Sequence, residues 1–160
     1  MANNHLVLIA GESTTGKSAC LRNIRNPEGV AYMNLEVNKA LPFASKFKEA
    51  NITDPLQVAA QFTALNNIKH IHTVVVDSLT FMLDQWKSKY LHTAKDTQKA
   101  WGLFAEFFKV LMTDHVANSN KGVIFTAHTL TTLNDQTHMM ETKVPVQGAL
   151  KNNGIEALAY

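Results

Sequence analysis

The sequence predicts an α/β domain with a mainly parallel β-sheet and helices on both faces. Short apolar runs alternate with stretches of helical spacing, and we expect strands at residues 6–10, 30–35, 72–77 and 122–127. Parallel neighbours need a crossover connection, usually a helix, so this alternation favours parallel pairing. A run that is apolar throughout, such as Leu6–Ala10, is typical of a strand buried on both faces.

Four helices and one loop complete the expected order. Residues 16–24 should form a helix that ends before a proline, and a second helix should begin at Asp54, which can cap it ahead of a proline. Helical spacing predicts two more helices, at residues 79–90 and 96–120. Residues 129–150 are polar and rich in threonine, and we expect a flexible loop there.

Composition narrows the class of protein. The 160 residues include 46% hydrophobic side chains and carry a formal net charge of +2, which suits one domain over residues 1–160 with a buried core. A single cysteine excludes an internal disulfide. No apolar run approaches the roughly 20 residues of a membrane span, and the first residues lack the basic start of a signal peptide. We therefore expect a cytoplasmic protein with no membrane partner.

One motif carries specific chemistry. Residues 11–18 fit G-x-x-x-x-G-K-[ST] at every fixed position, between an expected strand and an expected helix. Glycines allow a tight turn whose N–H groups point at phosphate oxygens, while Lys17 can reach the β- and γ-phosphates. The alternative is a surface turn that happens to contain a lysine. We predict binding of ATP and Mg²⁺, with the nucleotide held by Gly11, Glu12, Ser13, Thr14, Thr15, Gly16, Lys17, Ser18 and Ala19.

A phosphate-bound metal also needs an acidic ligand. Asp77 ends the apolar run 74–76, so the expected sheet would deliver its carboxylate to the edge that carries the phosphate loop. Asp77 could instead cap the helix that follows, a common role for aspartate. We predict that Ser18 and Asp77 bind Mg²⁺.

Hydrolysis further requires a group that positions or deprotonates the attacking water. Glu36 lies just beyond an expected strand, while Glu12 and Asp84 are alternatives. His128 ends another expected strand, where it could bind the γ-phosphate or be an ordinary strand-end histidine. We predict that the catalytic residues are Lys17, Glu36 and His128.

Arginine is scarce, since Arg22 and Arg25 are the only two in the chain. Kinases of small molecules bring several arginines to the transferred phosphate, so the sequence disfavours that class. A further cation would have to be a lysine, and Lys143 and Lys151 are candidates by position, acting from a neighbouring subunit.

The order of these motifs resembles the RecA-type ATPase core. It more closely resembles short bacteriophage nucleotide-binding proteins that consist of this core alone, some of which are single-strand annealing recombination proteins. The resemblance spans roughly residues 6–148. It implies ATP hydrolysis with Mg²⁺ and assembly into a ring or filament. It also implies that Glu36 matches the catalytic glutamate and that His128 takes the place of a γ-phosphate-sensing glutamine.

The resemblance also implies two DNA-binding segments, at about residues 87–99 and 129–147. The first has aromatic neighbours such as Trp86 and Tyr90, a pattern that suits phosphates and unstacked bases, and its lysines are Lys87, Lys89, Lys95 and Lys99. The alternative is a solvated helix face with Trp86 turned into the core. The second segment has few charges and would bind through backbone N–H groups and hydroxyls.

We therefore expect a Mg²⁺-dependent ATPase that acts on single-stranded DNA in phage recombination or replication, in the host cytoplasm. Its expected partners are ATP or ADP, single-stranded DNA and further copies of the chain. The alternative is a nucleotide-gated protein-interaction module with weak ATPase activity and no DNA binding.

Overall fold

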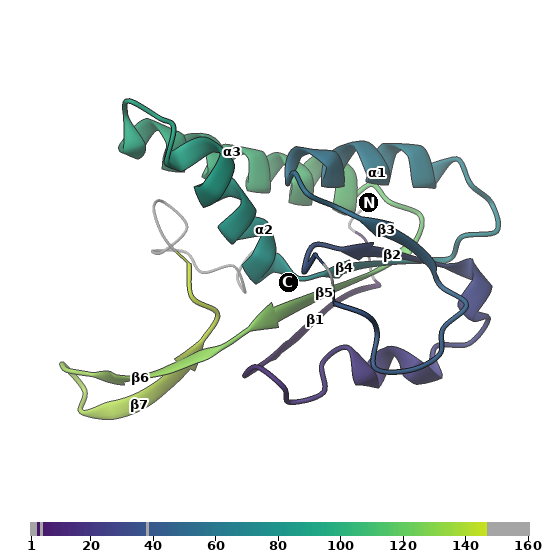
Figure 1. Cartoon of the computed structure of the whole chain (residues 1–160), viewed down its shortest axis with the longest axis horizontal. Helices are drawn as coiled ribbons and strands as arrows, with labels where there is room; N and C mark the ends of the chain where they lie inside the picture. The colour runs from purple at the N-terminus through teal and green to yellow at the C-terminus, as the bar shows by residue number, and fades with distance from the viewer. Residues whose placement is uncertain (1–2, 4, 38, 147–160) are drawn as a thin grey trace.

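The computed structural model describes residues 3, 5–37 and 39–146, which are built around a five-stranded sheet (Figure 1). The strand order is β1-β5-β4-β2-β3 and every pairing is parallel, which confirms the predicted α/β class. The strands are β1 (Leu6–Gly11), β2 (Val30–Asn34), β3 (Lys48–Asn51), β4 (Thr73–Asp77) and β5 (Gly122–His128). Because all five run the same way, their carboxyl ends meet at one edge.

The helices cover the two faces unequally. One face carries all the α-helices, which are α1 (Leu56–Asn66), α2 (Leu79–Trp86) and α3 (Thr97–Val110) (Figure 1). Two of them continue as π-helical segments, η3 (Lys87–Leu91) after α2 and η4 (Leu111–Val116) after α3. Among the described residues, the other face carries only the short 3₁₀ helices η1 (Ala19–Asn23) and η2 (Pro27–Gly29) and the chain between β2 and β3.

Caps explain where two of the predicted helices begin. The Asp96 carboxylate accepts a hydrogen bond from the backbone N–H of Lys99 at 2.9 Å, at the start of α3. Asp54 accepts from the N–H of Leu56 at 3.0 Å, at the start of α1. Each aspartate satisfies an N–H group that the first helical turn leaves without a partner.

The helix predicted over residues 16–24 is shorter than expected, since only Ala19–Asn23 is helical and the turn is 3₁₀. Asn26, with a left-handed φ of 51°, and Pro27 end the segment almost as soon as it starts. An α-helix is costly to nucleate and gains stability only by extension, so a segment this short forms a single tight turn.

The prediction of a loop over residues 129–150 was wrong for most of its length. The structure has an antiparallel hairpin of β6 (Leu130–Asn134) and β7 (Met139–Lys143), which extends away from the main sheet (Figure 1). The threonines of these strands are β-branched and favour extended backbone. Asn134 closes the turn by accepting hydrogen bonds from the N–H groups of Gln136 and Thr137 at 2.9 and 3.2 Å. Residues 147–150 lie outside the described residues.

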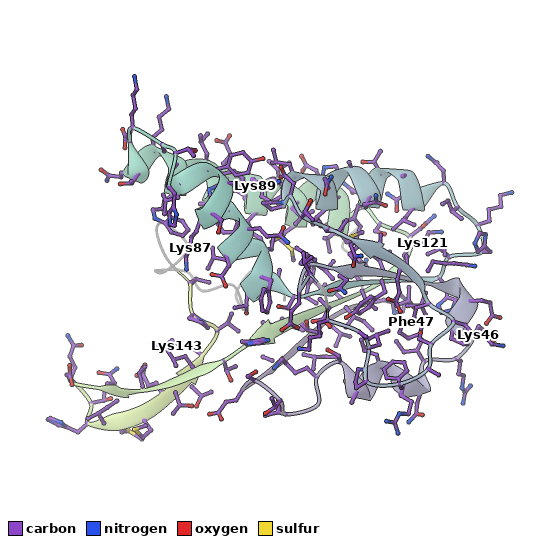
Figure 2. All side chains as sticks on the ribbon, in the orientation of Figure 1. Lys46, Phe47, Lys87, Lys89, Lys121 and Lys143 are labelled. Carbon is purple, nitrogen blue, oxygen red and sulfur yellow. The ribbon has the colours of Figure 1, made fainter. Side chains whose placement is uncertain are left out.

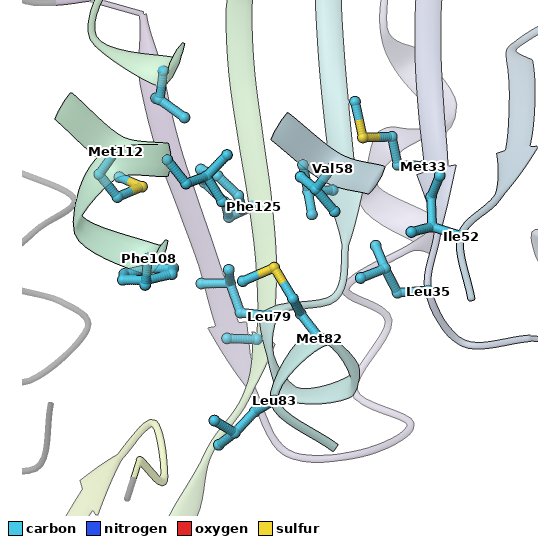
Figure 3. Packing of buried hydrophobic residues seen from close by; sticks show 14 of the residues in the cluster. Met33, Leu35, Ile52, Val58, Leu79, Met82, Leu83, Phe108, Met112 and Phe125 are labelled. Carbon is cyan, nitrogen blue, oxygen red and sulfur yellow. The ribbon is translucent and has the colours of Figure 1, made fainter. Parts of the chain in front are cut away.

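Successive side chains of β4 point to opposite faces of the sheet, and the core accordingly has two parts. Val74 and Val76 pack under the α-helices, whereas Val75 points to the thinly covered face, where it meets Leu21 and Phe47. Figure 3 shows the larger part, in which side chains from α1, α2, η4 and three strands meet; the labelled residues include Val58, Met82, Met112, Met33 and Phe125.

A cluster of aromatic side chains joins α2 to α3 within the larger part of the core. Trp86 packs on Phe104, with ring centroids 5.2 Å apart, and stacks on Phe107 at 5.8 Å. The indole N–H of Trp86 donates to the carbonyl of Ala100 at 3.2 Å. Among the helices of the described residues, none combines the length and hydrophobicity needed to cross a membrane.

We predict that Phe104→Ala lowers the free energy of unfolding by about 3–5 kcal/mol, because it leaves a cavity among four other aromatic rings. Urea unfolding followed by circular dichroism measures this loss. Leu103→Ala on the same helix is the matched control, since Leu103 is 51% exposed and its truncation should cost less than about 1 kcal/mol. Equal losses for the two variants would contradict the assigned packing.

Candidate nucleotide-binding site

The predicted site residues gather at the carboxyl edge of the sheet. Gly11, the last residue of β1, lies opposite His128 at the end of β5, and Asn34 of β2 lies opposite Asp77 at the end of β4. Glu36 follows β2 by two residues. The strand order therefore brings together groups that are far apart in the sequence.

The phosphate loop after β1 forms a closed turn. The Thr15 hydroxyl donates to the carbonyl of Glu12 at 2.8 Å, and Gly16 has a φ of +91°, which a side chain would disfavour. A Cβ atom on Gly11 would lie 2.8 Å from Oγ1 of Thr15, too close for any other residue without rearrangement. Both glycines are thus needed for the shape of the loop.

Lys17 bends back over this loop. Its Nζ donates to the carbonyl oxygens of Gly11 at 2.9 Å and Glu12 at 2.6 Å. Partial burial lowers the pKa of Lys17, and the charge of Lys39 lowers it further, whereas Asp77 and Glu36 act in the opposite direction. The ammonium group is bound by neutral oxygens, which anionic phosphate oxygens could replace.

Asp77 is the most enclosed acidic group of the site, only 4% exposed. Its Oδ2 accepts from the hydroxyl of Ser18 at 2.7 Å and from Tyr32, and its Oδ1 accepts from Thr126. Burial and the hydrogen bond to Asp77 raise the pKa of Tyr32. The carboxylate therefore faces the phosphate loop, whereas the N-cap of α2 is Ser78 and not Asp77.

The Ser18–Asp77 pair fits Mg²⁺. A hydroxyl and a carboxylate oxygen are hard ligands of the kind this ion prefers, and Mg²⁺ usually keeps several waters and substrate phosphates besides one or two protein ligands. Across the residues that the structure describes, no three His, Cys, Asp or Glu side chains cluster as a metal site. A sparse Ser–Asp site that relies on phosphate oxygens is consistent with that finding.

His128 stands between the phosphate loop and α2. Its backbone N–H donates to the hydroxyl of Thr80 at 2.9 Å, and its ring meets Phe81 edge-on at 5.7 Å. Burial lowers the pKa of His128, and the nearby charge of Lys17 adds to this effect. The imidazole is therefore neutral at pH 7 and can donate one hydrogen bond.

Glu36 occupies a turn just beyond β2, and its carboxylate forms an ion pair with Lys39. Its charge acts on both Lys17 and His128, which places it close to them. The two alternatives are engaged elsewhere. Glu12 accepts from the hydroxyl of Thr131 at 3.4 Å, and Asp84 pairs with Lys87 at 3.3 Å along α2.

Lys17, Ser18, Asp77 and His128 lie together on the wall of one cavity of about 350 Å³. Its lining residues are Thr14, Gly16, Lys17, Ser18, Ala19, Lys39, Ala40, Pro42, Asp77 and His128. The predicted residues Gly11, Glu12, Ser13, Thr15 and Glu36 do not line it, whereas Lys39, Ala40 and Pro42 line it without having been predicted. The available signal was the position of Lys39, three residues after a predicted catalytic glutamate, since one turn can bring such neighbours together.

A family model described as an AAA domain, AAA_24, matches residues 3–156. The chain belongs to this AAA domain family. Membership of this family is consistent with the parallel sheet, which is the fold of P-loop NTPases. It indicates nucleotide binding as the general activity of the domain. A comparison with curated protein sequences finds no match. The roles of the individual site residues stay predictions.

The two expected DNA-binding segments are partly helix and strand, and residues 92–96 of the first form the connection between η3 and α3. Residues 87–99 include η3 and the start of α3, and Trp86 is buried, as the alternative interpretation required. Lys87 and Lys89, near the end of α2 in Figure 2, pair with Asp84 and Asp54. In the described part of the chain, Lys95 and Lys99 form no ion pair and are exposed.

The later segment is the hairpin of β6 and β7. Lys143, labelled on this hairpin in Figure 2, pairs with Glu141 at 2.7 Å. Lys151, the other candidate for a cation from a neighbouring subunit, lies outside the described residues.

The lowered pKa of His128 has a consequence for stability. The pKa of His128 in the folded protein lies below the value of about 6.5 that histidine has in the unfolded chain. The contribution of His128 to stability is therefore complete above pH 6.5 and is lost as the pH falls through the folded pKa. We predict that His128→Gln makes the free energy of unfolding less dependent on pH between pH 7 and 5.

Urea unfolding at several pH values measures this dependence. Wild-type protein unfolded over the same pH series is the reference for this comparison. A wild-type pH dependence in His128→Gln would refute the assignment.

Proposed function

We propose that this AAA domain is a Mg²⁺-dependent ATPase that acts on single-stranded DNA. One observation carries the ATPase part of the proposal: a single cavity is lined by the phosphate loop, by the Ser18–Asp77 pair and by His128. Each group has the chemistry that one part of a bound nucleoside triphosphate requires.

Binding begins with the polyphosphate. The N–H groups of residues 12–18 and the ammonium of Lys17 take the β- and γ-phosphate oxygens, and Lys17 gives up the carbonyls of Gly11 and Glu12. Ser18 and Asp77 would hold Mg²⁺, which would neutralise phosphate charge.

Hydrolysis then needs one water molecule beside Glu36. The water oxygen attacks the γ-phosphorus and the bond from phosphorus to the bridging oxygen breaks. ADP leaves with the electron pair, and the water proton passes to the Glu36 carboxylate. Neutral His128 donates a hydrogen bond to a γ-phosphate oxygen, and Lys17 balances the charge that develops on the leaving group.

The hairpin is connected to the same loop. Thr129, which follows His128, donates its N–H to the carbonyl of Gly11 at 3.0 Å, and Thr131 reaches the Glu12 carboxylate at 3.4 Å. A rearrangement of the phosphate loop on nucleotide binding would therefore pull on the hairpin. This connection supports coupling between hydrolysis and a partner.

The choice of single-stranded DNA as the partner rests on two supports. One is the resemblance to RecA-type phage proteins, which also implies a role in phage recombination or replication and a ring or filament of copies. The other is the pair of exposed lysines Lys95 and Lys99, which can contact phosphates.

A second function is favoured by the surface of the hairpin. Its exposed side chains include four large apolar ones, Leu130, Leu133, Met139 and Met140, which are between 54% and 67% exposed. Of its charged side chains, Glu141 and Lys143 pair with each other, which leaves the acidic Asp135 in the exposed turn. Such a surface suits a protein partner better than a polyanion, so we keep a nucleotide-gated protein-interaction module as the alternative.

We predict that Lys17→Ala weakens binding of Mg-ATP by at least about a hundredfold, because two charge-assisted hydrogen bonds to phosphate are lost. ATP turnover should fall to background. Isothermal titration calorimetry and a phosphate-release assay measure the two effects, with Lys46→Ala, at an exposed site outside the cavity, as control. Unchanged nucleotide binding in Lys17→Ala would refute the proposed nucleotide site.

We predict that wild-type protein with Mg-ATP binds a labelled single-stranded oligonucleotide at low salt and that the oligonucleotide stimulates turnover. Replacing both Lys95 and Lys99 by alanine should reduce the slope of log K against log salt by about 1.4, because two phosphate contacts are lost. Fluorescence anisotropy across a salt series measures this slope. Absence of binding at low salt would favour the protein-interaction module.

A further inference from the structure

Lys39 is a second cation in the nucleotide cavity, and no role has been given to it so far. It lines the cavity together with Lys17, Asp77 and His128. Its own side chain is half exposed and its ammonium pairs with the carboxylate of Glu36. The predicted water-positioning group is therefore bound to a lysine that borders the phosphate site.

The backbone around Lys39 is held in place by the sheet. The carbonyl of Lys39 accepts a hydrogen bond of 2.8 Å from the side-chain amide of Asn34, a residue of β2 that is only 5% exposed. The N–H of Lys39 donates to the carbonyl of Glu36 at 3.0 Å, and the N–H of Leu35 donates to the carbonyl of Asp77 at 2.8 Å. This turn is thus fixed relative to the Asp77 carboxylate, while the long side chain of Lys39 keeps its freedom.

The charges around the cavity also point to Lys39. The arginines Arg22 and Arg25 are exposed and do not line the cavity. Lys17 is the cation of the phosphate loop itself, and within the described residues Lys39 is the other cation on the cavity wall. A terminal phosphate carries up to two negative charges and three acceptor oxygens, so it competes well with a single carboxylate for an ammonium group.

We propose that Lys39 binds the terminal phosphate of ATP and, in doing so, releases Glu36 to position the attacking water. The inference rests on the proposed function, whose site it deepens. ATP offers Lys39 a γ-phosphate and ADP does not, so the Glu36–Lys39 pair distinguishes the two nucleotides. It also makes the water-positioning carboxylate available only when a γ-phosphate is present. The cation is supplied within the same chain, in contrast to the lysines first considered from a neighbouring subunit.

The Glu36–Lys39 pair is suited to exchange because it contributes little to stability. Its lysine is 50% exposed, and exposed ion pairs are screened by solvent. Removing the ammonium of Lys39 should therefore leave the fold intact.

The test compares Lys39→Met with wild type in binding of a non-hydrolysable ATP analogue and of ADP, both with Mg²⁺. We expect the variant to bind the analogue at least about tenfold more weakly, with ADP affinity unchanged, because one charge-assisted hydrogen bond to the γ-phosphate is lost. Turnover should fall as well. Lys39→Arg should recover part of the lost affinity, and Lys46→Met, on the same connecting segment outside the cavity, should behave as wild type.

The outcomes separate this inference from the proposed function. If Lys39→Met binds both nucleotides as wild type does, or loses affinity for both equally, the inference is wrong. If Lys17→Ala loses both nucleotides in the same assay, the proposed nucleotide site stands whatever Lys39→Met does. If Lys17→Ala keeps both, the proposed function and the inference built on it are both wrong.

Discussion

The arrangement of the site depends on the hydrogen bonds that hold the buried Asp77 carboxylate. An ionised carboxylate away from water is costly unless donors replace its hydration. Here the hydroxyls of Ser18, Tyr32 and Thr126 supply them. They come from the end of the phosphate loop, from β2 and from β5, so one carboxylate fixes three neighbouring elements around the end of β4. The geometry of the cavity follows from satisfying that charge.

The unequal cover of the sheet explains why the cavity lies on this side. Asp77 points to the same face as Val75, where the covering elements are two 3₁₀ turns and the chain between β2 and β3. The three α-helices fill the opposite face with apolar side chains. This thin layer leaves room at the strand ends for a polar cavity. The turn that carries Lys39 belongs to the same layer and forms part of the cavity wall.

Local sequence could predict the parts whose signal is local. The phosphate loop has a fixed spacing, and runs such as Val74–Val76 show burial directly. Strand β3 carries no such signal, because its four residues, Lys48–Asn51, form a mostly exposed edge strand without an apolar alternation. The contacts of Tyr32 and Thr126 with Asp77 arise from the strand order β5-β4-β2, which a pattern along one strand cannot reveal. The position of Lys39 depends on the same tertiary arrangement.

The hairpin gives the site a mechanical connection to the surface. A two-stranded ribbon is marginally stable by itself, so β6 and β7 depend on what holds their base. That base is a direct continuation of β5, and Thr129 and Thr131 bind the phosphate loop at Gly11 and Glu12. The Glu12 carbonyl is also an acceptor for Lys17. In the proposed nucleotide complex, Lys17 would exchange these carbonyl oxygens for phosphate oxygens, and the loop would lose the Lys17–Glu12 hydrogen bond beside the base of the hairpin. The proposed nucleotide site and the base of the hairpin therefore share the same few residues.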